Sequence, residues 1–268
     1  MTAPSNLHPT DTDPSVATPN VHPTDKDPSA GTPNFDRLAR IYRWMELASF
    51  GPWLWWCRCN FLGEMGLSRR ALVLGDGDGR FTARLLQTNP TVRIDAIDAS
   101  PAMLRTLIGH AGPECARVQT QLADVRSWQP AGPATESGQN LPYDLVVTHF
   151  FLDCLTSIEV RALAATLHAA VSPSARWVVS EFAVPESWLG RWVARPVVWG
   201  LYCAFGWLTG LKVRQLPDHS TALQEAGFSL EMRRAWLGGL LTSELWGATL
   251  ADSAPGPQSA GANSHSKC

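Results

Sequence analysis

The sequence has little charge and no excess of either sign. Charged residues make up 17% of the 268 residues, and 22 Lys and Arg stand against 24 Asp and Glu, which gives a formal net charge of -2. No cluster of Lys and Arg supplies the local positive surface that phosphate groups would need. We therefore expect no nucleic acid partner.

The cysteines form neither a disulfide framework nor a metal centre. Six occur in the whole chain, and Cys57-x-Cys59 has no second paired site with the spacing of zinc ligands. For this reason we expect no structural metal.

Export and membrane signals are also missing. The amino-terminal residues MTAPSNLHPTDTDPSV have neither the basic start nor the apolar run of a secretory signal, so a cytoplasmic location is expected. The most apolar stretch, 192–211, is about long enough to cross a bilayer, but Arg195, Pro196 and three glycines interrupt it. We predict a buried or interfacial helical element there, with peripheral membrane contact through 188–211 as an alternative.

Both ends of the chain have the composition of solvated tails. Residues 7–20 and 21–34 are near copies rich in Pro, Thr, Ser and Asp, and 251–268 have a similar composition. The remaining chain is apolar enough for one substantial core. We predict disordered tails at 1–33 and 251–268 around one domain at 34–250.

Within this domain, periodicity indicates helices first and alternating strands and helices afterwards. A helix begins at the cap Asn34, and a second helical run covers 53–66. Strands are predicted at 71–75, 92–98, 117–122, 143–149 and 176–182, helices at 80–87, 101–110, 158–170 and 220–226, and a closing hairpin at 228–236 and 240–246. This order predicts an α/β fold with a doubly wound, mostly parallel, seven-stranded sheet.

The sharpest motif is Gly75-Asp76-Gly77-Asp78-Gly79, between a predicted strand and a predicted helix. Glycines allow a tight turn and close approach of a ligand, although a plain βα turn is the alternative. The spacing differs from the Gly-x-Gly-x-x-Gly dinucleotide fingerprint, which argues against NAD. About twenty residues on, Asp98 can accept hydrogen bonds from both hydroxyls of a ribose, or else cap the next helix. Together they favour a nucleoside ligand.

Several segments in order resemble class I S-adenosylmethionine-dependent methyltransferases. LVLGDGDGRF resembles the first motif of that family, IDAIDASPAML its second-strand motif, LADVRSW the segment whose acid contacts adenine, and YDLVVTHFFLD the fourth-strand motif. The resemblance covers roughly 34–248. It implies a Rossmann-like fold with amino-terminal lid helices, S-adenosyl-L-methionine as methyl donor, and a small-molecule acceptor.

The resemblance also implies which residues bind the cofactor. Val73 stands where the family usually has an acid, two positions before the first glycine, so we expect Asp76 and Asp78 to hold the cationic ammonium group instead. For Asp124 the alternative is a plain surface acid at a strand end. The expected cofactor-binding residues are Gly75, Asp76, Gly77, Asp78, Gly79, Asp98, Ala99, Met103, Asp124, Val125, His149 and, in the lid helix, Tyr42.

His149 and Glu181, at the ends of the fourth and fifth predicted strands, are the candidate catalytic residues, with packed or hydrogen-bonded side chains as the alternative. Methyl transfer does not require a strong base, because positioning and exclusion of water do most of the work. Tryptophans cluster at 44–56 and 188–207, which favours an apolar or aromatic acceptor unless they only pack helices. The rival functions are an aminopropyl transferase and a non-catalytic S-adenosylmethionine-binding or membrane-surface scaffold.

Overall fold

The computed structural model describes residues 52–130, 141–183 and 217–249, and all statements below concern these residues. The predicted tails, the first helix with Tyr42, and the stretch 188–211 lie outside them. None of the helices described is long and apolar enough to cross a membrane.

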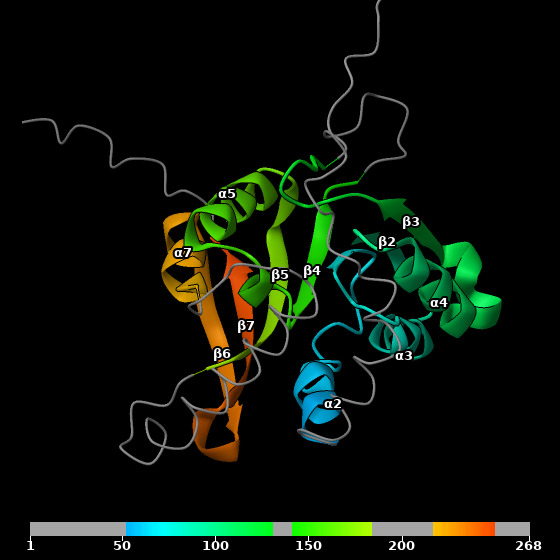
Figure 1. Cartoon of the computed structure of the whole chain (residues 1–268), viewed down its shortest axis with the longest axis horizontal. Coiled ribbons are helices and arrows are strands. Elements are labelled where there is room, and N and C mark those ends of the chain that lie inside the picture. The colour runs from blue at the N-terminus through cyan, green and yellow to red at the C-terminus, as the bar shows by residue number, and fades with distance from the viewer. Residues whose placement is uncertain (1–51, 131–140, 184–216, 250–268) are drawn as a thin grey trace, which may run out of the picture. The chain divides into compact units, whose positions relative to one another are not determined.

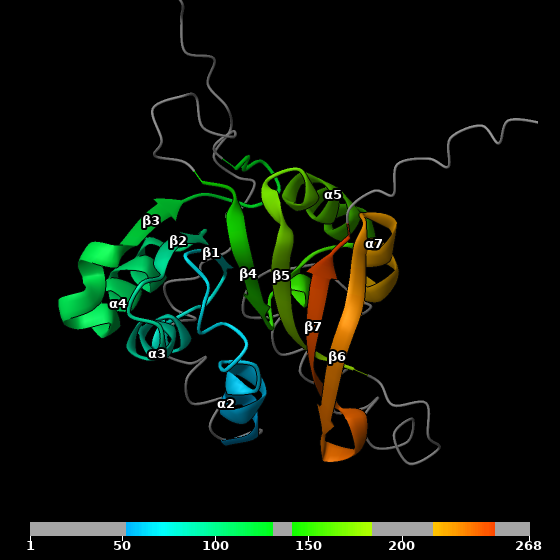
Figure 2. The same ribbon diagram turned by 180° about the vertical axis from the view of Figure 1, so that it is seen from behind.

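Seven strands form one sheet in the order β3-β2-β1-β4-β5-β7-β6 (Figures 1 and 2). Neighbours from β3 to β5 run parallel, while β7 is antiparallel to both β5 and β6. The predicted doubly wound, mostly parallel sheet with a closing hairpin is therefore confirmed. The strands are β1 Arg70–Leu74, β2 Arg93–Asp98, β3 Val118–Leu122, β4 Tyr143–His149, β5 Val171–Phe182, β6 Phe228–Trp236 and β7 Leu241–Ala248.

Helices cover both faces of the sheet. Leu72 and Leu74 of β1 belong to the apolar core with α5 and α7, whereas Ala71 and Val73 belong to the core with α3 and α4. Because β1 is buried on both faces, its sequence is continuously apolar rather than alternating. The helices are α2 Pro52–Cys59, α3 Arg80–Thr88, α4 Pro101–Ala111, α5 Ser157–His168 and α7 His219–Glu225, with short 3-10 turns η1 Gly112–Arg117, η2 Leu152–Cys154 and η4 Leu237–Gly239.

Two predicted boundaries are wrong. The helical run predicted at 53–66 is a helix only to Cys59, after which successive turns with i to i−3 backbone bonds lead to Gly66. Strand β5 begins at Val171 instead of residue 176, because Val171 already pairs with Tyr143 across a register shift. Because Pro173 and the serines beside it are not typical strand residues, strand propensity does not predict this extension.

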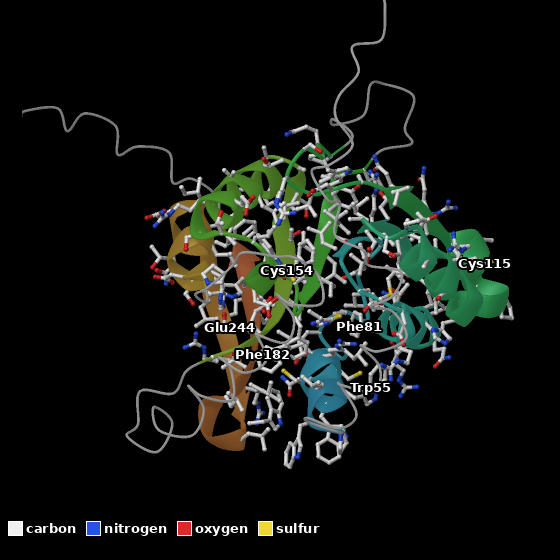
Figure 3. The ribbon with its side chains drawn as sticks, viewed as in Figure 1. Trp55, Phe81, Cys115, Cys154, Phe182 and Glu244 are labelled. Carbon is white, nitrogen blue, oxygen red and sulfur yellow. The ribbon has the colours of Figure 1, made fainter. Side chains whose placement is uncertain are left out.

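A buried carboxylate joins the closing hairpin to α7. Glu244 on β7 accepts hydrogen bonds from Arg233 Nε at 2.7 Å and Trp246 Nε1 at 2.9 Å, and lies 3.1 Å from His219 Nε2 (Figure 3). Burial acts to raise the pKa of Glu244, but the hydrogen bonds and charges of His219 and Arg233 outweigh it, so the pKa is lowered from its ordinary value. The ionised carboxylate therefore stabilises the fold.

We predict that Glu244→Gln lowers the free energy of unfolding by about 2 kcal/mol at neutral pH, because a charge-assisted network is replaced by weaker bonds. A group with a lowered folded pKa contributes fully above its ordinary value of 4.5 and loses this contribution as pH falls. The deficit should therefore shrink in acid. Urea unfolding at neutral and acidic pH measures both effects.

The matched control is Glu225→Gln. Glu225 forms an exposed ion pair with Arg161 at 2.9 Å, which should contribute less than about 1 kcal/mol. Equal stability of Glu244→Gln and the wild type at neutral pH would show that the buried network does not stabilise the hairpin.

Candidate active site

The candidate residues lie at the point where the strand order in the sheet reverses. From β1 the sheet continues through β2 and β3 on one side and through β4 and β5 on the other. In open α/β sheets, ligands bind at the carboxyl ends of the strands at such a switch point. The glycine loop, residues 75–79, follows β1 at this place, and the β4 turn, residues 150–152, follows β4.

Each glycine of the loop has a left-handed backbone, with φ of 63°, 67° and 79° at Gly75, Gly77 and Gly79. A Cβ on Gly75 would collide with the ring of Phe151, and one on Gly79 would lie 2.5 Å from the Leu107 backbone in α4. A Cβ on Gly77 would meet nothing within 4 Å. The outer glycines therefore allow close packing, whereas the middle one faces open space that a ligand can take.

Asp98, at the end of β2, is tied to this loop. Its Oδ1 accepts a hydrogen bond from the Ser100 amide at 2.8 Å, and its carboxylate also accepts from the amides of Gly77 and Ala99. Burial raises the pKa of Asp98 to about 6. The cap of α4 is Ser100, which accepts from the Met103 amide, so the alternative of Asp98 as a helix cap is wrong.

Asp76 is buried inside the loop and is only partly satisfied. Its Oδ2 accepts hydrogen bonds from the amide and hydroxyl of Thr82 at 2.9 and 2.7 Å, at the start of α3. Among the described residues, its Oδ1 has no hydrogen-bond partner. Burial raises the pKa of Asp76 to about 6, although the positive charge of Arg58 acts in the opposite direction. The free oxygen suits a cationic or hydrogen-donating ligand.

Sequence reasoning missed Arg58. This α2 residue is only 3% exposed, and its guanidinium lies 5.5 Å from the centre of the Phe150 ring. A signal was present: Arg58 follows Leu54 by four positions, which places a charge on the apolar face of a short aromatic helix. Its charge acts on both Asp76 and His149, so α2 contributes to the electrostatics at the carboxyl ends of β1 and β4.

Two further predicted acids form ion pairs with neighbouring arginines. Asp78 Oδ2 lies 2.7 Å from Arg80 Nε, and Asp124 Oδ2 lies 3.3 Å from a terminal nitrogen of Arg126. Asp124 follows β3 and is half exposed, as a plain surface acid would be. Both lie at the carboxyl edge of the sheet.

His149, the last residue of β4, is buried and held in place. Its Nδ1 lies 2.9 Å from Ser180 Oγ, and its ring packs edge-to-face on Phe81 with centroids 4.3 Å apart (Figure 3 labels Phe81). Within the described part of the chain, Nε2 has no hydrogen-bond partner. Burial, followed by the charge of Arg58, lowers the pKa of His149 well below its usual value. The imidazole is therefore neutral near pH 7.

Glu181 on β5 is also buried, but one of its oxygens is used. Oε1 accepts hydrogen bonds from the amides of Phe151 at 3.1 Å and Leu152 at 2.8 Å, while Oε2 has no partner among the residues described. Burial and the negative charge of Asp153 raise the pKa of Glu181 well above its ordinary value. Oε1 is therefore occupied by the backbone of the β4 turn.

An apolar cluster lies beside these residues at the ends of β4 and β5. The rings of Phe150 and Phe182 are 5.0 Å apart, and Phe182 is labelled in Figure 3. Trp236, at the end of β6, packs partly buried against the same cluster. The other members are Leu54, Cys57 and Leu241.

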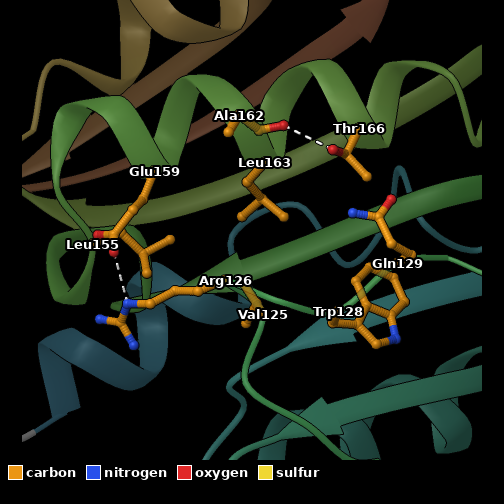
Figure 4. Close-up of a pocket in the computed structure, with 9 residues that line it drawn as sticks. All are labelled: Val125, Arg126, Trp128, Gln129, Leu155, Glu159, Ala162, Leu163 and Thr166. Carbon is orange, nitrogen blue, oxygen red and sulfur yellow. Dashed lines mark hydrogen bonds and ion pairs between the residues drawn. The ribbon is translucent and has the colours of Figure 1, made fainter.

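A separate cavity of about 100 Å³ lies between the segment after β3 and α5 (Figure 4). Arg126 Nε is 2.8 Å from Glu159 Oε1 at this cavity, and neither the glycine loop nor Asp98 lines it. In the described ranges no group of three His, Cys, Asp or Glu side chains could hold a metal ion. The lining residues are Val125, Arg126, Trp128, Gln129, Leu155, Glu159, Ala162, Leu163 and Thr166.

Comparison with known proteins agrees with this geometry. A family model described as "Methyltransferase domain" matches residues 72–176, which run from β1 into β5. A trans-aconitate 2-methyltransferase from Streptomyces avermitilis is 37% identical over 82 residues, which cover 30% of this chain and 27% of that protein. One from Escherichia coli is 47% identical over 57 residues, which cover 21% of each. The matches therefore span about a quarter of the length of these relatives.

Solved structures share the fold at low sequence identity. An O-methyltransferase family protein from Burkholderia thailandensis has a TM-score of 0.59 and 17% identity, covering 81% of this chain and 61% of that one. Mitomycin 7-O-methyltransferase has a TM-score of 0.57 and 15% identity, covering 80% and 60%. A TehB-like methyltransferase from Corynebacterium glutamicum has a TM-score of 0.51 and 15% identity, covering 79% and 98%. Residues 72–176 thus match a methyltransferase domain, and the described chain has the Rossmann-like fold of class I S-adenosylmethionine-dependent methyltransferases.

Proposed function

We propose that this protein transfers a methyl group from S-adenosylmethionine to a small-molecule acceptor. Three features at the ends of β1 and β2 carry the proposal. Gly77 faces open space, the Asp98 carboxylate accepts a hydrogen bond from the Gly77 amide, and Asp76 Oδ1 has no partner among the described residues. These residues fit the family's cofactor. When bound, S-adenosylmethionine supplies an electrophilic methyl carbon on a sulfonium.

Each part of the site then has a role that its chemistry suits. Asp98 would accept hydrogen bonds from the ribose hydroxyls, and Asp76 would hold the ammonium group in place of the acid that Val73 does not supply. Asp78 is a second candidate for the ammonium group. Tyr42 stays a proposed lid contact outside the described residues. The residues proposed to border the adenine are Ala99, Met103, Asp124 and Val125.

His149 is the better candidate for a proton acceptor. It is neutral, its Nε2 lacks a partner in the described chain, and Ser180 Oγ fixes the ring through Nδ1. An acceptor hydroxyl or amine that reaches Nε2 could pass its proton there as the new bond to carbon forms. Glu181 is the other candidate, and the two amide bonds to its Oε1 disfavour it.

The proposed acceptor is apolar or aromatic. The apolar cluster around Phe150 and Phe182 lies at the ends of the two strands that carry His149 and Glu181. Aromatic side chains at such a position can stack a flat substrate and keep water from the transfer. The names of similar proteins, which include trans-aconitate and mitomycin methyltransferases, support a small molecule as the acceptor class.

The rival functions have less support. An aminopropyl transferase requires several acids around a polyamine channel, whereas the cluster at the ends of β4 and β5 is apolar. A non-catalytic or membrane-surface scaffold depends on 188–211, which lie outside the described residues. No observation on the described chain favours either function over methyl transfer.

We predict that Asp98→Ala weakens binding of S-adenosylhomocysteine by roughly tenfold or more, because two charge-assisted hydrogen bonds to the ribose are lost. Isothermal titration calorimetry measures the affinity. Glu114→Ala is the control, because Glu114 is an exposed acid that pairs only with Arg117 in the structure described. Equal affinity of Asp98→Ala and the wild type would exclude Asp98 from the site.

We also predict that S-adenosylhomocysteine binds more tightly as pH rises through about 6. The pKa values of Asp76 and Asp98 are both about 6 in the free protein, and an ammonium group favours the ionised form of Asp76. Asp76→Asn should weaken binding at neutral pH and reduce this pH dependence to the part due to Asp98. Calorimetry at about pH 5 and pH 7.5 tests this. A wild-type affinity that does not change over the range would contradict it.

Once an acceptor is found, we predict that His149→Asn lowers kcat by roughly tenfold or more while the affinity for S-adenosylhomocysteine stays close to that of wild type. His168→Asn, at the exposed end of α5, is the matched control. A fall in cofactor affinity with unchanged kcat would instead make His149 a cofactor-binding residue.

A further inference from the structure

The β4 turn has a conformation that its own residues do not favour. Phe150 has φ of 53°, in the left-handed region that bulky residues rarely adopt. Such a backbone costs on the order of 1–3 kcal/mol and persists only where surrounding contacts hold it. On one side the Phe150 amide donates to the Ser180 carbonyl at 2.7 Å. The next two amides of the turn need their own acceptor.

Glu181 provides this acceptor from the neighbouring strand. Its Oε1 accepts from both following amides, those of Phe151 and Leu152, at 3.1 and 2.8 Å. Leu152 is fully buried and Glu181 is 2% exposed, so water does not easily replace either bond. Loss of the acceptor would leave the buried Leu152 amide unsatisfied, which is costly in a protein interior.

The β4 turn also places the Phe151 ring against the glycine loop. The Phe151 ring lies so close to Gly75 that even a single added carbon there would collide with it. The same loop is held on its other side by the Gly75 amide, which donates to the Ile97 carbonyl at 2.9 Å. Contacts thus run from Glu181 through the β4 turn to the start of the glycine loop.

We propose that Glu181 is a positioning residue of the cofactor site: its Oε1 holds the β4 turn, residues 150–152, so that the Phe151 ring fixes the glycine loop at Gly75. The inference rests on the proposed function, because the loop matters to affinity only if the cofactor binds there. It separates the role of Glu181 from that of a catalytic base. It also assigns the chemical requirement at residue 181, which is a hydrogen-bond acceptor of the right length.

The test compares Glu181→Gln with Glu181→Leu. Gln keeps an oxygen at the same reach, whereas Leu has similar size but no acceptor. We expect Glu181→Gln to bind S-adenosylhomocysteine as the wild type does, and Glu181→Leu to bind roughly tenfold more weakly. Hydrogen exchange of the Phe151 and Leu152 amides, followed by NMR without ligand, should be roughly a hundredfold faster in Glu181→Leu only.

Two further variants separate positioning from general loss of stability. Glu244→Gln removes a buried carboxylate on β7 and should lower stability without changing S-adenosylhomocysteine affinity. Phe151→Leu removes the ring and should weaken binding while the Leu152 amide stays protected. It tests the same pathway even if Glu181→Leu does not fold.

The outcomes are distinguishable. Equal affinity and equal amide protection in wild type and Glu181→Leu would overturn the positioning role, as would a Gln variant that loses as much affinity as Leu. Unchanged affinity in Phe151→Leu would remove the ring from the pathway. A wild-type protein that binds no S-adenosylhomocysteine would overturn the proposed function itself, while amide exchange would still report whether Glu181 holds the turn.

Discussion

The site depends on the absence of side chains at two positions of the glycine loop. Because Gly75 and Gly79 carry no Cβ, the Phe151 ring and the backbone of Leu107 can approach the loop directly. This close packing fixes the loop between the β4 turn and α4, and it leaves the Gly77 amide directed to Asp98. The proposed binding groups after β1 and β2 are thereby held next to each other before any ligand arrives, which lowers the cost of binding.

Much of this arrangement could be predicted from the sequence. Strands buried on both faces, such as β1, are short apolar runs, and the helices between them follow from periodicity. Parallel pairing of β1 with β2 brings the glycine loop and Asp98 to one edge of the sheet, so their association follows from the order of elements. The doubly wound class and the closing hairpin were predictable for this reason.

Other features depend on contacts between residues far apart in the chain. The bonds from the β4 turn to Glu181 leave no local pattern in the sequence, and the burial of Arg58 is indicated only by its position four residues after Leu54. In the sequence, Glu181 is only an acid at the end of a predicted strand. Its raised pKa can be inferred only when its burial and the negative charge of Asp153 are known. The left-handed Phe150 is likewise invisible in the sequence, because most phenylalanines avoid that conformation.

The departure of Val73 from the family pattern makes cofactor binding the central question, because we propose that Asp76 supplies the missing negative charge from inside the loop. Calorimetric titration of the wild-type protein with S-adenosylmethionine, S-adenosylhomocysteine and NAD answers it most directly. We expect binding of both sulfur nucleosides and none of NAD, since the glycine spacing does not suit a dinucleotide. Failure of both sulfur nucleosides to bind would contradict the proposal that the ends of β1 and β2 form a methyl-donor site.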